Sequence, residues 1–187
     1  AGPVERAIAG ALHDAGIDVV VATVNRNDER RARLDGLRTF YGNVLDEHVD
    51  LRLEMSGIGK LLALTPNDEV NTLTARRFSD MFGRGETYQV APTQPPAGVE
   101  GGAADLGGRI VFGEDLDYDA LRTRLRRSGI NVTPVPDRFD LAAFRAEHDG
   151  EVTPLFAVRR KRLFVAAVDT PVALVDRLQP GDRLFWL

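Results

Sequence analysis

Apolar residues along the first half of the sequence follow two different periods. The apolar run at residues 61–64 and the mostly apolar segment at residues 18–23 predict buried strands, and short strands are expected at residues 39–41 and 87–90. Between these runs apolar residues recur at helical spacing, as on the buried face of an amphipathic helix. Strands that alternate with helices over short connections favour a parallel sheet built from right-handed crossovers.

The helices can be placed from the same pattern. The first, over residues 1–16, carries Val4, Ile8 and Leu12 on one face and has Gly16 as its C-terminal cap. The remaining predictions for this part are helices at residues 28–37, 46–55 and 66–82 and a polar loop at residues 24–28. Thr65 follows a predicted strand directly, so it is expected at the carboxyl edge of the sheet, where open parallel sheets bind ligands.

Residues 91–108 are rich in proline and glycine and carry too little apolar surface to fold alone, which predicts a linker. The pattern beyond the linker predicts helices at residues 118–128 and 141–148 and strands at residues 109–112, 130–134, 154–158, 163–168 and 183–187. The last three strands are expected to be antiparallel, with turns at residues 159–161 and 180–182. The predicted fold class is α/β, with a parallel-sheet unit at residues 1–90 and a small α+β domain at residues 109–187.

Composition changes this picture mainly by exclusion. A formal net charge of −4 gives no overall attraction to nucleic acid or to an anionic membrane, so neither is expected as a direct partner. The absence of cysteine excludes disulfides and thiolate metal sites, and the three histidines have no paired ligand spacing, so no metal site is expected. No apolar run is long enough to span a membrane and no signal peptide is recognised, so we expect a soluble piece.

The sequence offers no residue that we would assign to catalysis. It lacks a Tyr-x-x-x-Lys pair, a Gly-x-Ser-x-Gly nucleophile turn and a Gly-Lys-Ser/Thr phosphate loop. Glu47 and His48 share a predicted helix, but nothing else converges on them, and both are expected at the surface. An enzyme is therefore not expected, and a small NAD(P)-dependent oxidoreductase stays as the alternative from another class.

Four segments carry a resemblance to a known family: AGPVERAIAGALHDAG, DVVVAT with the following NRND, YGNVLDE, and LALTPNDEVNTLTAR. The last is the most specific, because a strand that ends in Thr is followed by Asp-Glu-x-Asn at the start of a helix. Together the segments resemble the RCK or TrkA-N domain, a nucleotide-binding half-Rossmann domain that regulates potassium channels and cation transporters. The resemblance covers residues 1–90 and implies a Rossmann-like parallel sheet.

Two later segments are similar to the cytosolic tails of bacterial antiporters that exchange sodium or another monovalent cation for protons. They are GRIVFGEDLDYDALRTRL and the terminal PGDRLFWL. This similarity implies a regulatory module on the cytoplasmic face of the cell membrane, joined to a membrane-embedded transporter domain of the same parent protein. RCK-like domains pair, so the resemblance also implies a homodimer. A structural dimerisation domain with a degenerate nucleotide site is a further alternative.

The resemblance implies cofactor-binding residues around the carboxyl edge of the sheet. They are Gly2, Pro3 and Val4 at the start of the first helix, Thr23, Asn25 and Arg26, Asn43 and Val44, and Thr65, Asn67 and Asn71. The implied cofactor is NAD(H) or an adenine nucleotide, whose phosphates would meet N–H groups at the start of the first helix. Threonine and asparagine are also ordinary capping residues at helix starts, and that structural role is the competing interpretation.

Departures from the family pattern weaken this implied site. Glu5 stands at the third glycine position of Gly-x-Gly-x-x-Gly. A phosphate charge about 4 Å from its carboxylate would be repelled by about 4 kcal/mol at an effective dielectric of roughly 20, whereas a helix terminus contributes only about 0.3 to 1 kcal/mol. Thr23 or Asn25 replaces the acid that binds ribose, and Asn43 replaces an aspartate. We therefore expect NAD to bind weakly or not at all, although Arg26 could meet a 2′-phosphate.

The first strand of the Rossmann order has no counterpart before the first predicted helix. In the order 3-2-1-4-5 it would lie between the strands at residues 18–23 and 61–64. Each of these strands then lacks one ladder partner. We expect a sheet that is destabilised, swapped with another chain, or rearranged.

Overall fold

The computed structural model of the chain describes residues 2–47, 49, 57–93, 107–148, 150–169, 174 and 177–187. Its helices are α1 (Pro3–Asp14), α2 (Arg26–Leu34), α4 (Asp68–Phe82), α5 (Tyr118–Ser128) and α6 (Leu141–Glu147), with a short 3-10 helix η1 (Arg84–Glu86). Its strands are β1 (Val20–Thr23), β2 (Arg38–Tyr41), β3 (Leu61–Ala63), β4 (Thr87–Val90), β5 (Arg109–Val111), β6 (Asn131–Pro134), β7 (Pro154–Arg159), β8 (Arg162–Val165) and β9 (Arg183–Trp186). Most of the helix predicted at residues 46–55 lies outside the described residues.

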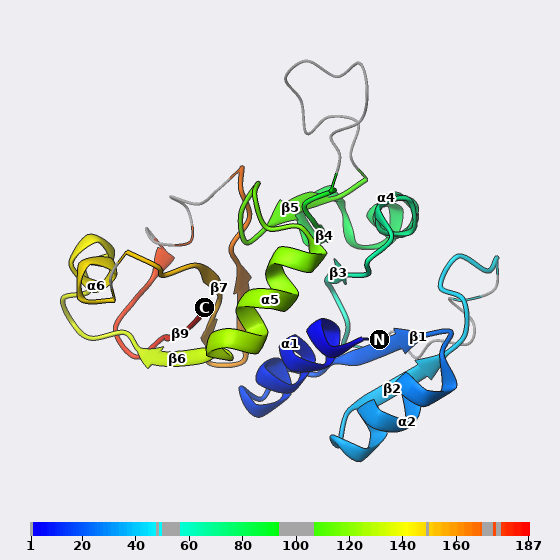
Figure 1. Cartoon of the computed structure of the whole chain (residues 1–187), viewed down its shortest axis with the longest axis horizontal. Coiled ribbons are helices and arrows are strands. Elements are labelled where there is room, and N and C mark those ends of the chain that lie inside the picture. Colours follow the sequence, from blue (N-terminus) through cyan, green and yellow to red (C-terminus); the bar gives the residue numbers. More distant parts are fainter. Residues whose placement is uncertain are drawn as a thin grey trace.

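The first unit contains a parallel sheet in two pieces. β1 pairs with β2, from Val20 opposite Arg38 to Thr23 opposite Tyr41. β3 pairs with β4 and β4 with β5, all parallel, and no ladder joins β1 to β3 within the described part of the chain. The predicted α/β class with a Rossmann-like parallel sheet is confirmed. The sheet is divided where the family order would place its first strand, and Figure 1 shows the two pieces apart.

Side-chain packing bridges the two pieces of the parallel sheet. Phe40 of β2 and Phe78 of α4 are buried in one apolar cluster, together with partly buried Val20 of β1 and Leu61 of β3. Hydrophobic attraction is non-directional, so it does not require the exact register of a hydrogen-bonded ladder. The pieces can therefore stay associated without a strand between them.

β5 extends the parallel sheet beyond the predicted linker. The sequence pattern placed residues 109–112 in the second unit, but Ile110 lies opposite Gln89 of β4. Gly107, just before this strand, packs against α4. A Cβ on Gly107 would lie only 2.1 Å from the backbone oxygen of Thr72 in that helix. The end of the predicted linker is thus packed on a helix at a distance that only glycine allows.

The second unit is built on an antiparallel sheet in the order β6-β9-β7-β8, which confirms the antiparallel arrangement predicted for its last three strands. The turn between β7 and β8 has left-handed φ values at Arg160 and Lys161, 44° and 67°. Two such residues match the twist of a tight hairpin. The other predicted turn is also present, since Gly181 has a φ of 84° and Asp182 N–H donates to the Gln179 carbonyl over 3.0 Å.

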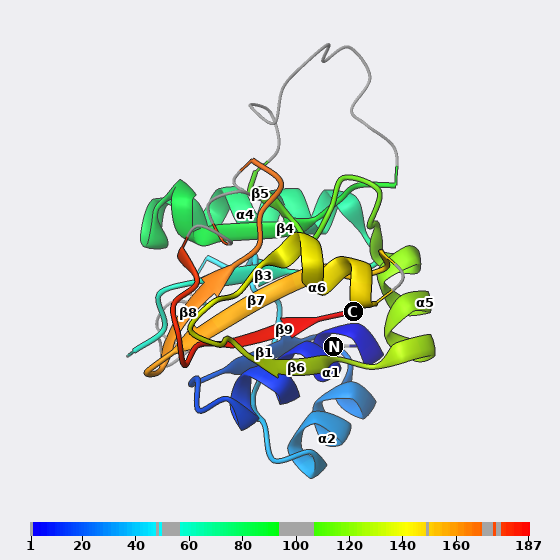
Figure 2. The same cartoon turned by 90° about the vertical axis from the view of Figure 1, so that its left-hand side faces the viewer.

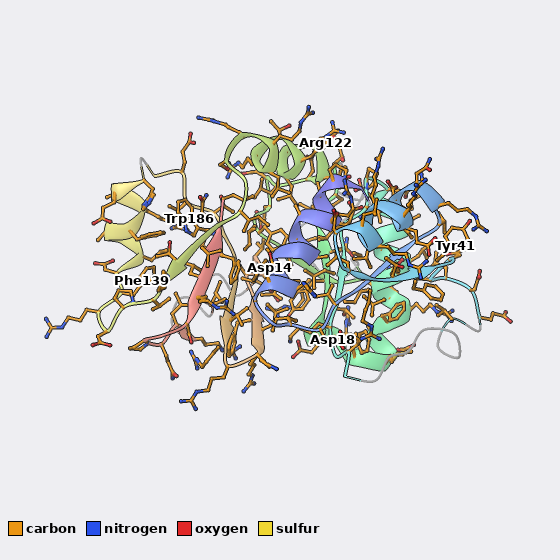
Figure 3. All side chains as sticks on the ribbon, turned by 90° about the horizontal axis from the view of Figure 1, so that it is seen from below. Asp14, Asp18, Tyr41, Arg122, Phe139 and Trp186 are labelled. Carbon is orange, nitrogen blue, oxygen red and sulfur yellow. The ribbon has the colours of Figure 1, made fainter. Side chains whose placement is uncertain are left out.

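An aromatic cluster joins α6 to the second sheet. Phe144 of α6 meets Trp186 of β9 edge to face, with ring centroids 5.3 Å apart, and Phe139 lies 5.5 Å from Phe144. The Trp186 indole N–H donates to Thr133 Oγ1 over 3.0 Å. Figure 3 shows Phe139 and Trp186 at the opposite end of the molecule from Tyr41.

Residues 166–168, which the pattern placed in one strand with β8, join the two sheets. The N–H of Val168 donates to the Ile110 carbonyl of β5 over 2.8 Å. The N–H of Ala166 donates to the Leu155 carbonyl of β7 over 2.9 Å. One short segment therefore pairs with the edge of the parallel sheet and also with a strand of the antiparallel sheet.

One of the hydrophobic clusters among the described residues runs through both units. It contains Ile8 of α1, Val90 of β4, Leu121 of α5 and Phe156 of β7, each at most 2% exposed. Helices α1 and α5 contact each other and lie side by side, as Figures 1 and 2 show. The packing of α5 on α1 places the start of one helix against the start of the other.

Two predicted helix starts are wrong by two residues. α2 begins at Arg26 and α4 begins at Asp68, whereas the apolar pattern predicted residues 28 and 66. An asparagine immediately before each helix caps it with its side chain. Cap chemistry, and not apolar spacing, fixes the first residue of both helices.

Candidate functional site

The residues predicted to bind a cofactor lie at strand ends and helix starts. We call them together the strand-end site. It consists of residues 2–4 at the start of α1, Thr23 at the end of β1 with Asn25 and Arg26 after it, Asn43 and Val44 after β2, and Thr65, Asn67 and Asn71 after β3. The pairing of β1 with β2 brings the second and third of these groups together, since Gly42 N–H donates to the Thr23 carbonyl over 3.0 Å.

The polar side chains after β1 and β2 hydrogen bond to their own backbone. Thr23 is 8% exposed, and its Oγ1 accepts from Asn25 N–H over 3.1 Å. Asn25 Oδ1 accepts from Asn27 N–H over 2.9 Å as the cap of α2, and Asn43 Oδ1 accepts from Leu45 N–H over 2.9 Å. A ribose hydroxyl would have to compete with these local bonds.

Arg26 and Val44 face other protein groups. The Arg26 guanidinium lies over the Tyr41 ring, 4.5 Å from its centroid, in a cation–π contact. Val44 is partly buried against the apolar cluster that contains Phe40. A 2′-phosphate would therefore have to draw Arg26 away from an aromatic partner.

The residues after β3 form a closed network. Asn71 is 1% exposed, and its Oδ1 accepts from both Thr65 N–H and Thr65 Oγ1, over 2.9 and 2.7 Å. Its Nδ2 donates back to the Thr65 carbonyl over 2.8 Å. Asn67 Oδ1 caps α4 by accepting from Val70 N–H over 2.9 Å. The amide of Asn71 thus clamps the loop between β3 and α4, and Asn67 has the capping role.

The start of α1 is covered by two side chains of the chain itself. A Cβ at Gly2 would lie 2.6 Å from the Tyr118 hydroxyl and 3.0 Å from Glu5 Oε2. Tyr118 opens α5 and is 8% exposed, and Asp117 caps that helix by accepting from Ala120 N–H over 2.8 Å. In a phosphate site the missing Cβ of a glycine leaves room for the phosphate. At Gly2 that room is occupied by the Tyr118 hydroxyl and the Glu5 carboxylate.

Burial dominates the electrostatics at this place. It raises the pKa of the Glu5 carboxyl above its usual value, while the backbone N–H groups of Glu5 and Gly2 oppose the rise and Asp28 adds to it. Burial and then the nearby Glu5 charge raise the pKa of Tyr118 to about 12. Glu5 Oε2 is buried and makes no hydrogen bond within the described part of the chain. The start of α1 therefore already carries an acidic group that is poorly solvated.

A small pocket of about 190 Å³ lies at the other end of the parallel strands, between Arg84, residues 107–110, Val168 and Asp169. Arg109 makes a two-pronged contact with Asp169, with Nη2 to Oδ1 at 2.8 Å and Nε to Oδ2 at 2.9 Å. The lining therefore holds one ion pair, Arg109 with Asp169, and the further positive charge of Arg84.

The described residues show neither a metal-binding cluster nor a membrane-spanning helix. No group of three or more His, Asp or Glu side chains among them is arranged to hold a metal ion. None of the helices within those ranges is long and apolar enough to cross a bilayer.

Comparison with known families matches the TrkA-N domain to residues 1–95, just over half of the sequence. The chain belongs to the TrkA-N family. A solved structure described as the GsuK RCK domain is 12% identical with a TM-score of 0.29, and the match covers 89% of this chain and 42% of that one. No curated protein matches the chain. This TrkA-N chain thus spans less than half the length of the solved chain.

TrkA-N domains in general bind nucleotides and regulate ion transport, so the strand-end site has to be compared with that ligand. The start of α1 does not fit a phosphate group, because Glu5 and Tyr118 occupy the open side of Gly2. The ribose side offers Thr23 and Asn25, whose oxygens are already used. The residues present do not form the family's nucleotide site at the phosphate position.

Tyr118 is the site residue that sequence reasoning missed. It belongs to a helix that was predicted correctly at residues 118–128, but it was not connected with Gly2 or Glu5. Local periodicity reports which face of α5 is buried, not which distant residue covers it. A Tyr directly after a capping Asp gives no local sign of this long-range contact.

Proposed function

We propose that the chain is a cytosolic regulatory module of a membrane transporter for monovalent cations, and that the transporter is a cation:proton antiporter rather than a potassium channel. The observation that carries this proposal is the TrkA-N match over residues 1–95, together with a parallel sheet in the same part of the chain. The similarity of residues 108–125 to antiporter tails supports the choice of transporter. The module works by allostery and carries out no chemistry of its own.

In this proposal the module acts as a homodimer at the cytoplasmic face of the membrane, attached to a transporter domain of the same parent protein. A ligand or a dimer contact favours one arrangement of the paired modules, and that preference shifts the transporter between states. NAD(H) or an adenine nucleotide binds weakly or not at all, because Glu5 and Thr23 replace the family's binding groups. Nucleic acid is not a partner.

The second candidate is a structural dimerisation domain whose nucleotide site has decayed. The filled space beside Gly2 favours it, because a site without room for phosphate has no need to retain nucleotide recognition. The two candidates share the dimer and differ in whether the module controls transport.

Cation transport by the parent protein in vesicles separates the two candidates. Deleting the module should change the transport rate or its dependence on pH, whereas a purely structural domain would change only the oligomeric state. Calorimetric titration of the intact chain with NAD, NADH, ATP and AMP tests the weak binding directly. Unchanged transport by a deletion variant that still forms dimers would contradict the regulatory proposal.

A further inference from the structure

The start of α1 is a place where positive partial charge is concentrated. The free N–H groups of α1 point out of the helix near Gly2, and α5 begins beside them at Tyr118. Helix N-termini carry positive partial charge, so the start of α1 favours an anion, whereas the start of α5 is already capped by the Asp117 carboxylate. In a nucleotide-binding member of this architecture that anion is a phosphate.

Here an anion is already supplied by the chain. Glu5 is the third residue of α1, from which a carboxylate can reach back to the N-terminal N–H groups of its own helix. The backbone N–H groups of Gly2 and Glu5 act to lower the pKa of its carboxyl, and its Oε2, which makes no hydrogen bond among the described residues, lies 3.0 Å from the position of a Gly2 Cβ. The Tyr118 hydroxyl fills the rest of that space, 2.6 Å from the same position.

We propose that Glu5 and Tyr118 form an internal plug, in which the Glu5 carboxylate takes the place of a nucleotide phosphate at the start of α1 and Tyr118 closes that place from α5. The same N–H groups cannot serve both anions, so the plug makes the start of α1 independent of nucleotide. It also ties a helix of the second unit to the helix that would otherwise respond to ligand. The plug does not depend on whether the chain regulates a transporter.

Binding of inorganic pyrophosphate to the intact chain, followed by calorimetry at neutral pH, tests the plug. The wild-type chain should show no saturable binding at millimolar pyrophosphate. Glu5→Ala should open the place between the helices and bind pyrophosphate with a dissociation constant at least about tenfold below the millimolar limit set by the wild type. Glu5→Gln, which removes the charge and keeps the size, should show a smaller gain and covers the case in which Glu5→Ala does not fold.

Two further variants show where pyrophosphate binds. Glu69→Ala removes the same charge from the exposed first turn of α4 and should leave the chain without binding, as in the wild type. Adding Gly2→Ala to Glu5→Ala should cancel the gain, because a Cβ would again fill the phosphate position. Saturable binding by the wild type that equals binding by Glu5→Ala would overturn the plug. So would folded Glu5→Ala and Glu5→Gln variants that bind no better than Glu69→Ala.

This test reads binding and not transport. A transporter whose rate responds to the module while Glu5→Ala gains no affinity would reject the plug and leave the proposed regulation standing. If Glu5→Ala gains affinity for pyrophosphate but the module has no effect on transport, the plug stands and the proposed regulation is rejected.

Discussion

Gly2 is the residue at which the chemistry of the family and the packing of this chain diverge. In a nucleotide-binding domain a glycine here admits a phosphate, whereas in this chain it admits Tyr118 and Glu5. Glycine is needed in both cases, but here the space beside it holds side chains of the same chain and not a ligand. Gly10, inside the helix that Gly2 precedes, has open space where its Cβ would be, and it serves as an internal comparison.

The Gly2→Ala variant should be destabilised by about 1 to 3 kcal/mol, because the added Cβ would crowd the Tyr118 hydroxyl. Gly10→Ala should be stabilised by up to about 1 kcal/mol, since alanine is preferred in the interior of a helix. Urea unfolding of both variants measures the difference. If Gly2→Ala proved as stable as Gly10→Ala, the close contact described here would be incorrect.

The Glu5→Gln variant should change how stability depends on pH. The pKa of Glu5 in the folded chain is raised above 4.5, so the folded state binds the proton more tightly than the unfolded state. The stabilising effect of the protonated form is fully present below pH 4.5, the ordinary pKa of a glutamate, and is lost as the pH rises through the pKa of the folded state. Wild-type stability should therefore fall relative to Glu5→Gln as the pH is raised to neutrality. Thermal unfolding over this range tests it, and parallel curves would contradict the raised pKa.

Local chemistry explains which single residues could be anticipated. Asn67 is adjacent to the helix that it caps, so a capping role could be proposed from sequence and is present in the structure. The clamp of Asn71 on Thr65 spans one loop and was seen only as a choice between capping and ligand binding. The contact of Tyr118 with the start of α1 depends on tertiary packing, which local sequence does not encode.

At the scale of helices and strands, well-capped and strongly periodic segments were the predictable ones. α5 spans the predicted residues 118–128, between the cap Asp117 and Gly129 with its left-handed φ of 66°. β4 spans the predicted residues 87–90. The partner of β5 was not predictable, because a short apolar run fits either sheet and only the close approach at Gly107 places it beside α4.

Hydrogen exchange should reveal the divided parallel sheet. β4 has a ladder partner on both sides and all four of its residues are buried, whereas the ladders of β1 and β3 each run along one side. Amides in β4 should exchange at least about tenfold more slowly than those in β1, because strands paired on one side open at lower free energy. Mass spectrometry or NMR can measure this, and equal protection of β1 and β4 would argue for a strand between the two pieces.

At the scale of the whole molecule, the two units share one core. Sequence composition indicated the proline- and glycine-rich segment and suggested two separate units. It could not show that Leu121 and Phe156 would pack in the same cluster as Ile8. Apolar patterns identify buried faces, but they do not say which buried faces meet.

Cutting the chain between Thr93 and Gly107 should leave its halves together. A protease site inserted within residues 94–106 breaks the connection but not the shared core or the ladder between β4 and β5. The two fragments should therefore elute as one species by size exclusion and separate only in denaturant. The uncut protein with the same insertion is the control. Fragments that separate in native buffer would show that the units are independent.

The backbone hydrogen bonds of residues 166–168 limit how the two sheets can move relative to each other. The backbone of these residues is bonded to β5 on one side and their first residue to β7 on the other, so swinging the two sheets apart would break main-chain bonds and not merely slide side chains. The two sheets are therefore expected to move together as one rigid body. In the proposed dimer, movement would then occur between copies and not between the sheets of one copy. Two fluorescent labels, one on each sheet, should then hold a constant spacing, and in the proposed dimer any change should appear between labels on different copies.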